Sequence, residues 1–333
     1  MSRLASSAEI FFIFFPEILA KGPPITLMRI TFISTYKIKC GISEYTYNLS
    51  RALLGLGHEV TVLANIPSGS GQDVLQLASD PTGLRLIRCW GVSGWGAKGD
   101  PDEDIIRDEV KRADVVHWQF QNFLYDERLQ TLFGAELAMT KAKRVVTLHD
   151  SGIGPAFRHD VVDKFLASRR GILDAAGVAG SVVPMGAVYR RPLVATFGLG
   201  RSNADLIAKS CERIGFDFKV FSWTDWVPSK DDFIDRLRTA DALVLAFPDV
   251  GAEVVSSSVR DALATYRPVI VTSSSWFSDL MAKPGLVTFC QYDEVAIASA
   301  LNSLLGGRAG WLKDNSWEAA ARANLAAYDS VKR

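Results

Sequence analysis

Short apolar runs alternate with amphipathic segments along most of this chain. Residues 28–35 form a continuous, largely β-branched run, which is typical of a parallel strand buried on both faces. The following segment has apolar positions at helical spacing, with Ser43 as its expected N-cap and Gly57 at its end. A second apolar run at 59–64 comes next. This alternation predicts a parallel sheet covered by helices.

The alternation continues in two series separated by Pro184, Gly186 and Pro192. In the first series we expect strands at 84–88, 114–118 and 144–148, and helices near 102–112 and 127–141. In the second we expect strands at 193–197, 217–221, 241–247, 267–272 and 286–289, and helices near 202–214, 230–239, 256–265, 293–305 and 315–331. The fold class is therefore α/β, with two doubly wound, Rossmann-like sheets. Ligands of such sheets bind at the carboxyl ends of the strands, where a cleft is expected.

The first 27 residues differ from this pattern. The apolar run Ile10–Phe15 is too short to span a bilayer. We expect residues 1–27 to be an extension or an interfacial segment outside the folded core, with a signal peptide as the alternative.

Composition excludes several classes of function. The 37 basic and 37 acidic residues give a net charge of zero, which argues against nucleic acid as a partner. Cys40, Cys89, Cys211 and Cys290 are scattered, as expected for reduced thiols in a cytoplasmic protein without a metal site or disulfides. Residues 141–191 hold nine Lys or Arg against four Asp or Glu. This local excess suits either a solvated face or a surface for an anionic acceptor or membrane.

The segment from Gly251 to Thr272 carries the strongest chemical signal. Glu253 precedes a predicted helix, Asp261 lies on its early turns, and the serines at 256–258 open it. The unpaired amides and positive dipole of a helix start attract anions. Carboxylates on both sides of a phosphate site suit a ligand with hydroxyls at its ends, such as a nucleotide-sugar. The alternative is a helix with solvated acids.

Three weaker motifs follow predicted strands. Gly41 would let a ligand approach the backbone at a helix start, although an ordinary turn is the alternative. His117 and His149 are expected at strand ends, where they could donate to substrate hydroxyls, or else be structural.

A glycine pair, Gly198 and Gly200, resembles part of a dinucleotide fingerprint, with Asp225 as its ribose-binding acid. The third glycine of that fingerprint is replaced by Asn203. Arg201, in the same loop, could neutralise a diphosphate.

Together these residues resemble glycosyltransferases of the GT-B fold, specifically the retaining family 4, from Met28 to the C-terminus. Segments similar to the family's landmarks occur in order at 28–42, 57–62, 114–119, 147–150, 240–245, 251–263 and 267–272. Trp317 and Tyr328 lie in what resembles the family's last helix, which crosses back onto the first domain. The resemblance implies an acceptor domain at 28–186, a nucleotide-sugar donor domain at 187–314 and a crossover helix at 315–333.

The resemblance also implies a role for each site residue. Glu253 would contact the transferred sugar, Asp261 the ribose, and the amides of Ser257, Ser258 and Val259 the distal phosphate. Gly41 and Ile42 would close over the diphosphate, His149 would lie near the anomeric carbon, and Arg201 would offset charge on the leaving group, with Gly198 in the adjoining glycine loop. Transfer would retain configuration and need no obligatory metal or cofactor.

The sequence departs from the family pattern at three points. Asp261 stands where the family has a glutamate, and the lysine expected soon after Arg201 is absent, with Arg190 or Arg191 as candidate substitutes. The stretch from His149 to Pro184 is also shorter than in relatives, which points to a reduced acceptor side.

The first hypothesis is therefore a cytoplasmic hexosyltransferase of polysaccharide biosynthesis, with peripheral contact at the inner face of the membrane. It would use a nucleoside-diphosphate sugar and a glycan or lipid-linked acceptor. The second is a non-catalytic nucleotide-sugar-binding homologue or scaffold of a glycan-assembly complex. The third is a nicotinamide-dependent enzyme that uses the Gly198 loop.

Overall fold

The structure is a computed structural model that describes residues 26–67, 79–91, 100–197, 203–221, 229–249, 251, 256–281 and 285–332. The chain divides into two compact units, one ending at Phe165 and the other running from Leu166 to Lys332. Each unit is described by itself. The predicted domain boundaries, the cleft and the crossing of the last helix stay predictions.

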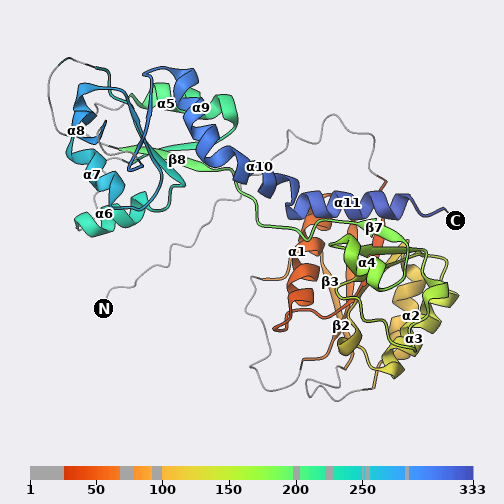
Figure 1. Cartoon of the computed structure of the whole chain (residues 1–333). Coiled ribbons are helices and arrows are strands. Elements are labelled where there is room, and N and C mark those ends of the chain that lie inside the picture. Colours follow the sequence, from red (N-terminus) through yellow and green to blue (C-terminus); the bar gives the residue numbers. More distant parts are fainter. Residues whose placement is uncertain are drawn as a thin grey trace, which may run out of the picture. The chain divides into compact units, whose positions relative to one another are not determined.

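The first sheet has seven strands in the order β3-β2-β1-β4-β5-β6-β7. Strand β1 lies between β2 and β4 and is parallel to both, and β4 pairs in parallel with β5. Figure 1 shows α1 on one side of these strands and α2 and α3 on the other. The strands are β1 (Arg29–Ser34), β2 (Glu59–Asn65), β3 (Arg85–Trp90), β4 (Val115–Phe120), β5 (Lys143–Leu148), β6 (Lys164–Ala167) and β7 (Gly180–Val182). The helices are α1 (Gly41–Gly55), α2 (Glu103–Arg112), α3 (Glu127–Met139) and α4 (Arg170–Ala175).

The second sheet has five parallel strands in the order β12-β11-β10-β8-β9. One face packs against α6, α7 and α8 through residues such as Phe233, Val259 and Leu280, and the other against α5 and α9 through Ile207 and Ile297. The strands are β8 (Leu193–Phe197), β9 (Asp217–Phe221), β10 (Ala242–Leu245), β11 (Val269–Thr272) and β12 (Thr288–Cys290). The helices are α5 (Ala204–Ile214), α6 (Lys230–Leu237), α7 (Ser257–Leu263), α8 (Ser278–Met281) and α9 (Glu294–Leu301).

Two further helices, α10 (Gly307–Asp314) and α11 (Trp317–Asp329), complete the chain. The start of α11 is tied to the segment before β8, because Trp317 N donates to the carbonyl of Ala187 at 3.2 Å. Gly186 has a φ of +83°, and a Cβ there would lie 2.2 Å from the Trp317 ring. Glycine is therefore required at this joint for both its backbone angle and its lack of a side chain.

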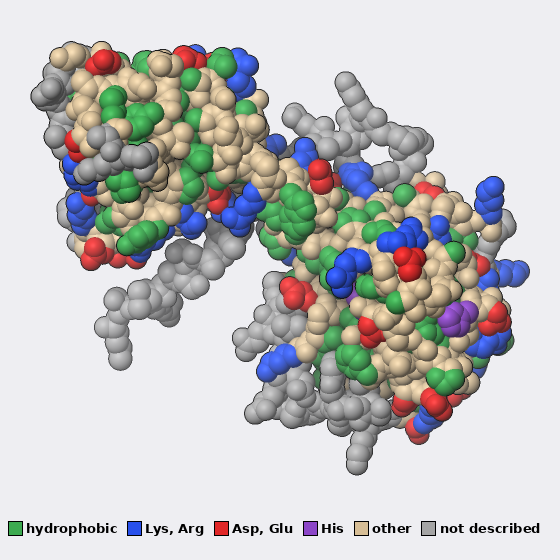
Figure 2. All heavy atoms as spheres, in the orientation of Figure 1, with side chains coloured by type: hydrophobic (Ala, Val, Ile, Leu, Met, Phe, Trp, Pro, Cys, Tyr) green, Lys and Arg blue, Asp and Glu red, His purple; other side chains and the backbone are tan. Residues whose placement is uncertain are grey.

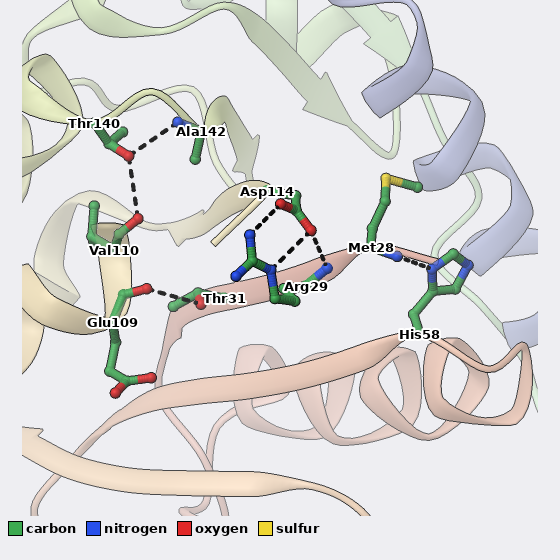
Figure 3. Close-up of polar contacts among 9 residues, drawn as sticks. All are labelled: Met28, Arg29, Thr31, His58, Glu109, Val110, Asp114, Thr140 and Ala142. Carbon is green, nitrogen blue, oxygen red and sulfur yellow. Dashed lines mark hydrogen bonds and ion pairs between the residues drawn. The ribbon is translucent and has the colours of Figure 1, made fainter. Parts of the chain in front are cut away.

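Three aspartates, each directly before a strand, bind backbone and arginine groups at the amino-terminal ends of neighbouring strands. Asp114 accepts from the backbone N–H of Arg29 at 2.8 Å and pairs with its guanidinium at 2.7 Å. Figure 3 shows this carboxylate reaching both groups of Arg29. Asp163 does the same with Arg144, at 2.9 and 2.5 Å. In the second sheet, Asp241 accepts from Leu193 N at 2.8 Å and pairs with Arg190 at 2.7 Å.

The predicted fold class is confirmed as two parallel α/β sheets. Every predicted strand and helix is present, with ends that differ by a few residues. The sequence pattern did not predict β6, β7, α4, α8 and α10, most of which are short. Among the described residues, no helix combines the length and apolar character that crossing a bilayer requires.

Candidate functional site

His149 directly follows β5 at the carboxyl end of the first sheet. Its backbone N–H donates to the Phe120 carbonyl at 3.0 Å, and its Nε2 lies 2.8 Å from Oε1 of Gln119. The Tyr45 ring of α1 meets it edge-on, with ring centroids 5.1 Å apart. The ring is partly exposed, yet desolvation by its surroundings lowers the pKa of His149 to about 4. Nδ1 has no hydrogen-bond partner among the described residues, which leaves this atom available to a ligand.

His117 occupies a different kind of position, and the expectation that it lies at a strand end is wrong. It lies within β4, is fully buried, and has Nε2 at 2.7 Å from Oγ1 of Thr147 on the next strand. Burial lowers the pKa of His117 to about 3, so its ring is neutral at physiological pH. The structural alternative therefore holds for His117.

Gly41 and Ile42 form the first turn of α1, one turn before Tyr45. The helix begins earlier than predicted. Cys40 is the N-cap, and Ser43 lies inside the helix, where its hydroxyl accepts from Ile38 N at 3.0 Å. A Cβ added to Gly41 would have no atom of the described residues within 4 Å. Space is therefore open beside the backbone at the helix start, as a closely approaching ligand requires.

Part of the predicted donor site lies on helix α7, which packs against the second sheet. Its N-cap is Ser256, so Ser257, Ser258 and Val259 supply the first-turn amides. Val259 is fully buried in the core, and only its backbone could meet a ligand. Asp261 is buried in the second turn, and Oδ1 of its carboxylate lies 2.7 Å from Nζ of Lys230, whose side chain is mostly exposed. This buried carboxylate is thus held by a cation at the surface.

The remaining predicted site residues, Gly198, Arg201 and Glu253, lie outside the described residues, as do Gly200 and Asp225. Asp249 and Gly251, which precede Glu253 in the chain, lie within the described residues. Asp249 Oδ1 accepts from Gly251 N at 3.1 Å and from the Ser275 hydroxyl at 2.8 Å, and this hydroxyl holds the pKa of Asp249 below its usual value. The start of the Glu253 loop is therefore anchored to the segment that follows β11.

Arg190 and Arg191 do not lie where the missing lysine would act. Arg190 is bound to Asp241, and Arg191 lies 4.0 Å from Asp217. Both arginines precede β8 and contact the amino-terminal ends of its neighbours, whereas the Arg201 loop follows the carboxyl end. The suggestion that they substitute for that lysine is wrong, because a strand separates the two ends.

The basic segment 141–191 is partly neutralised within the chain. Arg144 pairs with Asp163, Arg158 with Asp160, and Arg190 with Asp241. Figure 2 shows basic and acidic side chains interspersed over the face in view. In the part of the chain that the structure describes, no group of three or more His, Cys, Asp or Glu side chains is arranged to hold a metal ion.

Three residues that contact His149 or Asp261 were not predicted from the sequence: Tyr45, Gln119 and Lys230. Gln119 alternates with His117 along β4, and this spacing of two could have placed both on one face of the strand. Tyr45 and Lys230 gave no such signal, because each meets its partner across the fold.

No protein-family model matches the chain, and no curated protein sequence matches it. Solved structures that resemble it include a glycosyltransferase from Rickettsia africae, at 12% identity and a TM-score of 0.41 over 92% of this chain and 99% of that one. AviGT4, a glycosyltransferase of avilamycin A biosynthesis, has 15% identity and a TM-score of 0.36 over 91% and 97%. The Anabaena protein HepE in complex with UDP-glucose has 10% identity and a TM-score of 0.33 over 90% and 94%. TM-scores below 0.5 assign the chain neither a fold nor a function.

Proposed function

We propose that the chain is a glycosyltransferase that moves a sugar from a nucleoside-diphosphate sugar to a hydroxyl of a glycan or lipid-linked acceptor. One observation carries the proposal. Nδ1 of His149 lies at the carboxyl end of a parallel sheet and has no hydrogen-bond partner among the described residues. The His149 ring contacts the helix whose first turn leaves open space at Gly41. A hydroxyl-binding group beside a phosphate-binding helix start suits a sugar joined to a diphosphate.

The second unit would bind the nucleotide. The α7 amides would receive the distal phosphate, Asp261 the ribose, and Glu253 the transferred sugar, as the resemblance to family 4 implies. The ion pair with Lys230 supports the role of Asp261, because it holds the carboxylate in place, and carboxylate oxygens can accept from ribose hydroxyls.

The proposed reaction retains configuration and uses no metal. A nucleoside diphosphate is already a good leaving group, so the protein has to orient the donor and stabilise the charge that develops on the departing phosphate. Helix-start amides and Arg201 would provide this stabilisation. We also propose that the acceptor is a glycan or a lipid-linked molecule and that the protein contacts the membrane peripherally.

The test has a binding arm and a turnover arm. UDP-, GDP-, ADP- and dTDP-sugars are screened by thermal shift, since a ligand at 100 times its Kd adds about 2.7 kcal/mol to stability. The nucleotide that binds is then used in transfer assays with glycan and polyprenyl-phosphate-sugar acceptors. Glu253→Ala should bind the free nucleoside diphosphate as wild type does and lose transfer. Equal transfer by this variant would refute the assignment.

A second candidate is a nucleotide-sugar-binding protein without turnover. It is favoured by the engagement of Arg190 and Arg191 at the opposite end of the sheet, which leaves the missing lysine unreplaced by either. Nucleotide-sugar binding together with no transfer to any acceptor, and no slow hydrolysis of the donor, would support it.

A further inference from the structure

Gln119 bridges the two histidines of the first unit. It is fully buried on β4, and its side-chain amide lies between two ring nitrogens of the same kind. Its Nε2 is 3.2 Å from Nε2 of His117, and its Oε1 is 2.8 Å from Nε2 of His149. One side chain therefore contacts both rings.

The two ends of a primary amide have opposite hydrogen-bonding character, because the NH₂ end only donates and the oxygen only accepts. The ring nitrogen that faces the oxygen must carry a proton, and the one that faces the NH₂ group must present a lone pair. His149 faces the oxygen and His117 faces the NH₂ group. Neutral rings in this arrangement hold opposite tautomers, with the proton of His149 on Nε2 and that of His117 on Nδ1.

The surroundings support this assignment. The Thr147 hydroxyl, 2.7 Å from His117 Nε2, is compatible with this assignment, because a hydroxyl can donate as well as accept. Tyr45 packs edge-on against the His149 ring at an interplanar angle of 80° and restricts its rotation. The free Nδ1 of His149 is then a hydrogen-bond acceptor, whereas the sequence led us to expect a donor.

We propose that Gln119 is a positioning residue that fixes His149 as a hydrogen-bond acceptor for a hydroxyl of the bound sugar. This inference rests on the proposed function. A sugar hydroxyl that donates to Nδ1 would be held through its own proton, and its oxygen would stay free to accept from other groups.

The first test needs no substrate. ¹⁵N NMR of histidine-labelled wild-type protein at pH 7.5 distinguishes protonated from unprotonated ring nitrogens, and His149→Gln and His117→Gln assign the signals. We expect His149 to be protonated at Nε2 and His117 at Nδ1. Matching tautomers in the two rings, or a proton on Nδ1 of His149, would overturn the proposal.

The second test separates positioning from folding. Gln119→Leu should lower affinity for the nucleotide-sugar about 10-fold and leave affinity for the free nucleoside diphosphate within 2-fold, because only the sugar meets His149. Thr147→Val is the matched control, since its hydroxyl lies against the His117 ring, and it should leave both affinities unchanged. Equal losses for the two ligands in Gln119→Leu would show a merely structural role.

The two tests also distinguish this inference from the proposed function. A wild-type protein that binds no nucleotide-sugar would refute the function, and with it the sugar-binding role of His149. The ring tautomers would still be read from the spectrum and would decide whether Gln119 sets the state of His149. If Gln119→Leu does not fold, the wild-type spectrum alone gives that answer.

Discussion

The two ends of the strands use polar residues in opposite ways. At the amino-terminal ends, Asp114, Asp163 and Asp241 each satisfy a backbone N–H and an arginine, so their carboxylates are committed within the chain. At the carboxyl end of the first sheet, Nδ1 of His149 has no hydrogen-bond partner among the described residues, and in the second unit the Asp261 carboxylate pairs with the exposed Lys230. Polar residues whose hydrogen-bonding groups are satisfied within the chain stabilise the fold. Polar residues that keep an unsatisfied donor or acceptor can bind a ligand.

This difference separates two sets of residues that looked alike in the sequence. The aspartates at 114 and 241 belong to segments similar to family landmarks, yet they lie far from a ligand-binding end. His117 and His149 looked equivalent, and only His149 has an open nitrogen. A motif shared with a family can therefore mark a structural contact as well as a site.

The largest expected effect concerns pH. Two histidines have pKa values below 6.5, about 3 for the buried His117 and about 4 for the partly exposed His149. As pH falls below 6.5, the unfolded chain takes up protons that the folded chain does not, so stability is lost. Between pH 7 and pH 5 each ring should cost at most about 2 kcal/mol.

Asp114 responds in a different pH window. Arg29 lowers the pKa of Asp114, so this carboxylate loses its contribution only as pH falls below the unfolded value of 3.8. Urea unfolding at pH 7, 6 and 5 should show a loss that is roughly halved in His149→Gln and unchanged in Asp114→Asn. A flat profile in the wild type would contradict the neutral histidine pair.

Next in size is the effect of His149→Ala on transfer. Loss of a hydrogen bond at the reacting sugar should lower kcat/KM about 100-fold, as for other single groups that stabilise a transition state. The melting temperature should change little, because the ring lies at the carboxyl end of the sheet and is partly exposed. His159→Ala, at an exposed histidine of the same unit, is the matched control and should keep full activity.

Asp241→Ala should do the reverse. It removes the acceptor for Leu193 N and the partner of Arg190, and should lower the free energy of unfolding by about 1–2 kcal/mol. Asp241→Asn, which keeps one oxygen acceptor, should lose less. Nucleotide affinity of the folded fraction, measured by calorimetry well below the melting temperature, should match wild type; a 10-fold loss would place Asp241 in the site instead.

Gly41→Ala separates binding from stability at one position. The Cβ has free space, and alanine favours a helix by about 0.5–1 kcal/mol over glycine, so the melting temperature should hold or rise. Nucleoside-diphosphate affinity should fall about 10-fold, because the methyl group occupies the space beside the helix start. Gly55→Ala, at the other end of α1 and equally uncrowded, should leave affinity unchanged.

The smallest expected effect is that of Lys230→Met. Loss of the ion pair should loosen the Asp261 carboxylate and lower the preference for a ribonucleotide over its 2′-deoxy form about 5-fold. Lys219→Met, on β9 of the same unit, controls for removal of a positive charge. An equal loss of affinity for both nucleotides would indicate a charge effect without ribose recognition.

The sequence by itself determined the two parallel sheets and nearly all of their elements. Alternating apolar runs and amphipathic segments are local patterns, and a strand such as β8 ends where its run ends, at Phe197. The same local logic named Gly41 and Asp261 as site candidates. It failed for β6 and β7, of four and three residues.

Only the tertiary structure decided which polar atoms are engaged in hydrogen bonds or ion pairs within the chain. Gln119 meets His149 across 30 residues of chain, and Lys230 meets Asp261 across 31 positions, from 230 to 261. No local pattern encodes such pairs, since they depend on which strands and helices become neighbours. The sequence thus determined where carboxylates and imidazoles occur, and the packing of strands decided which of them keep an atom for a ligand.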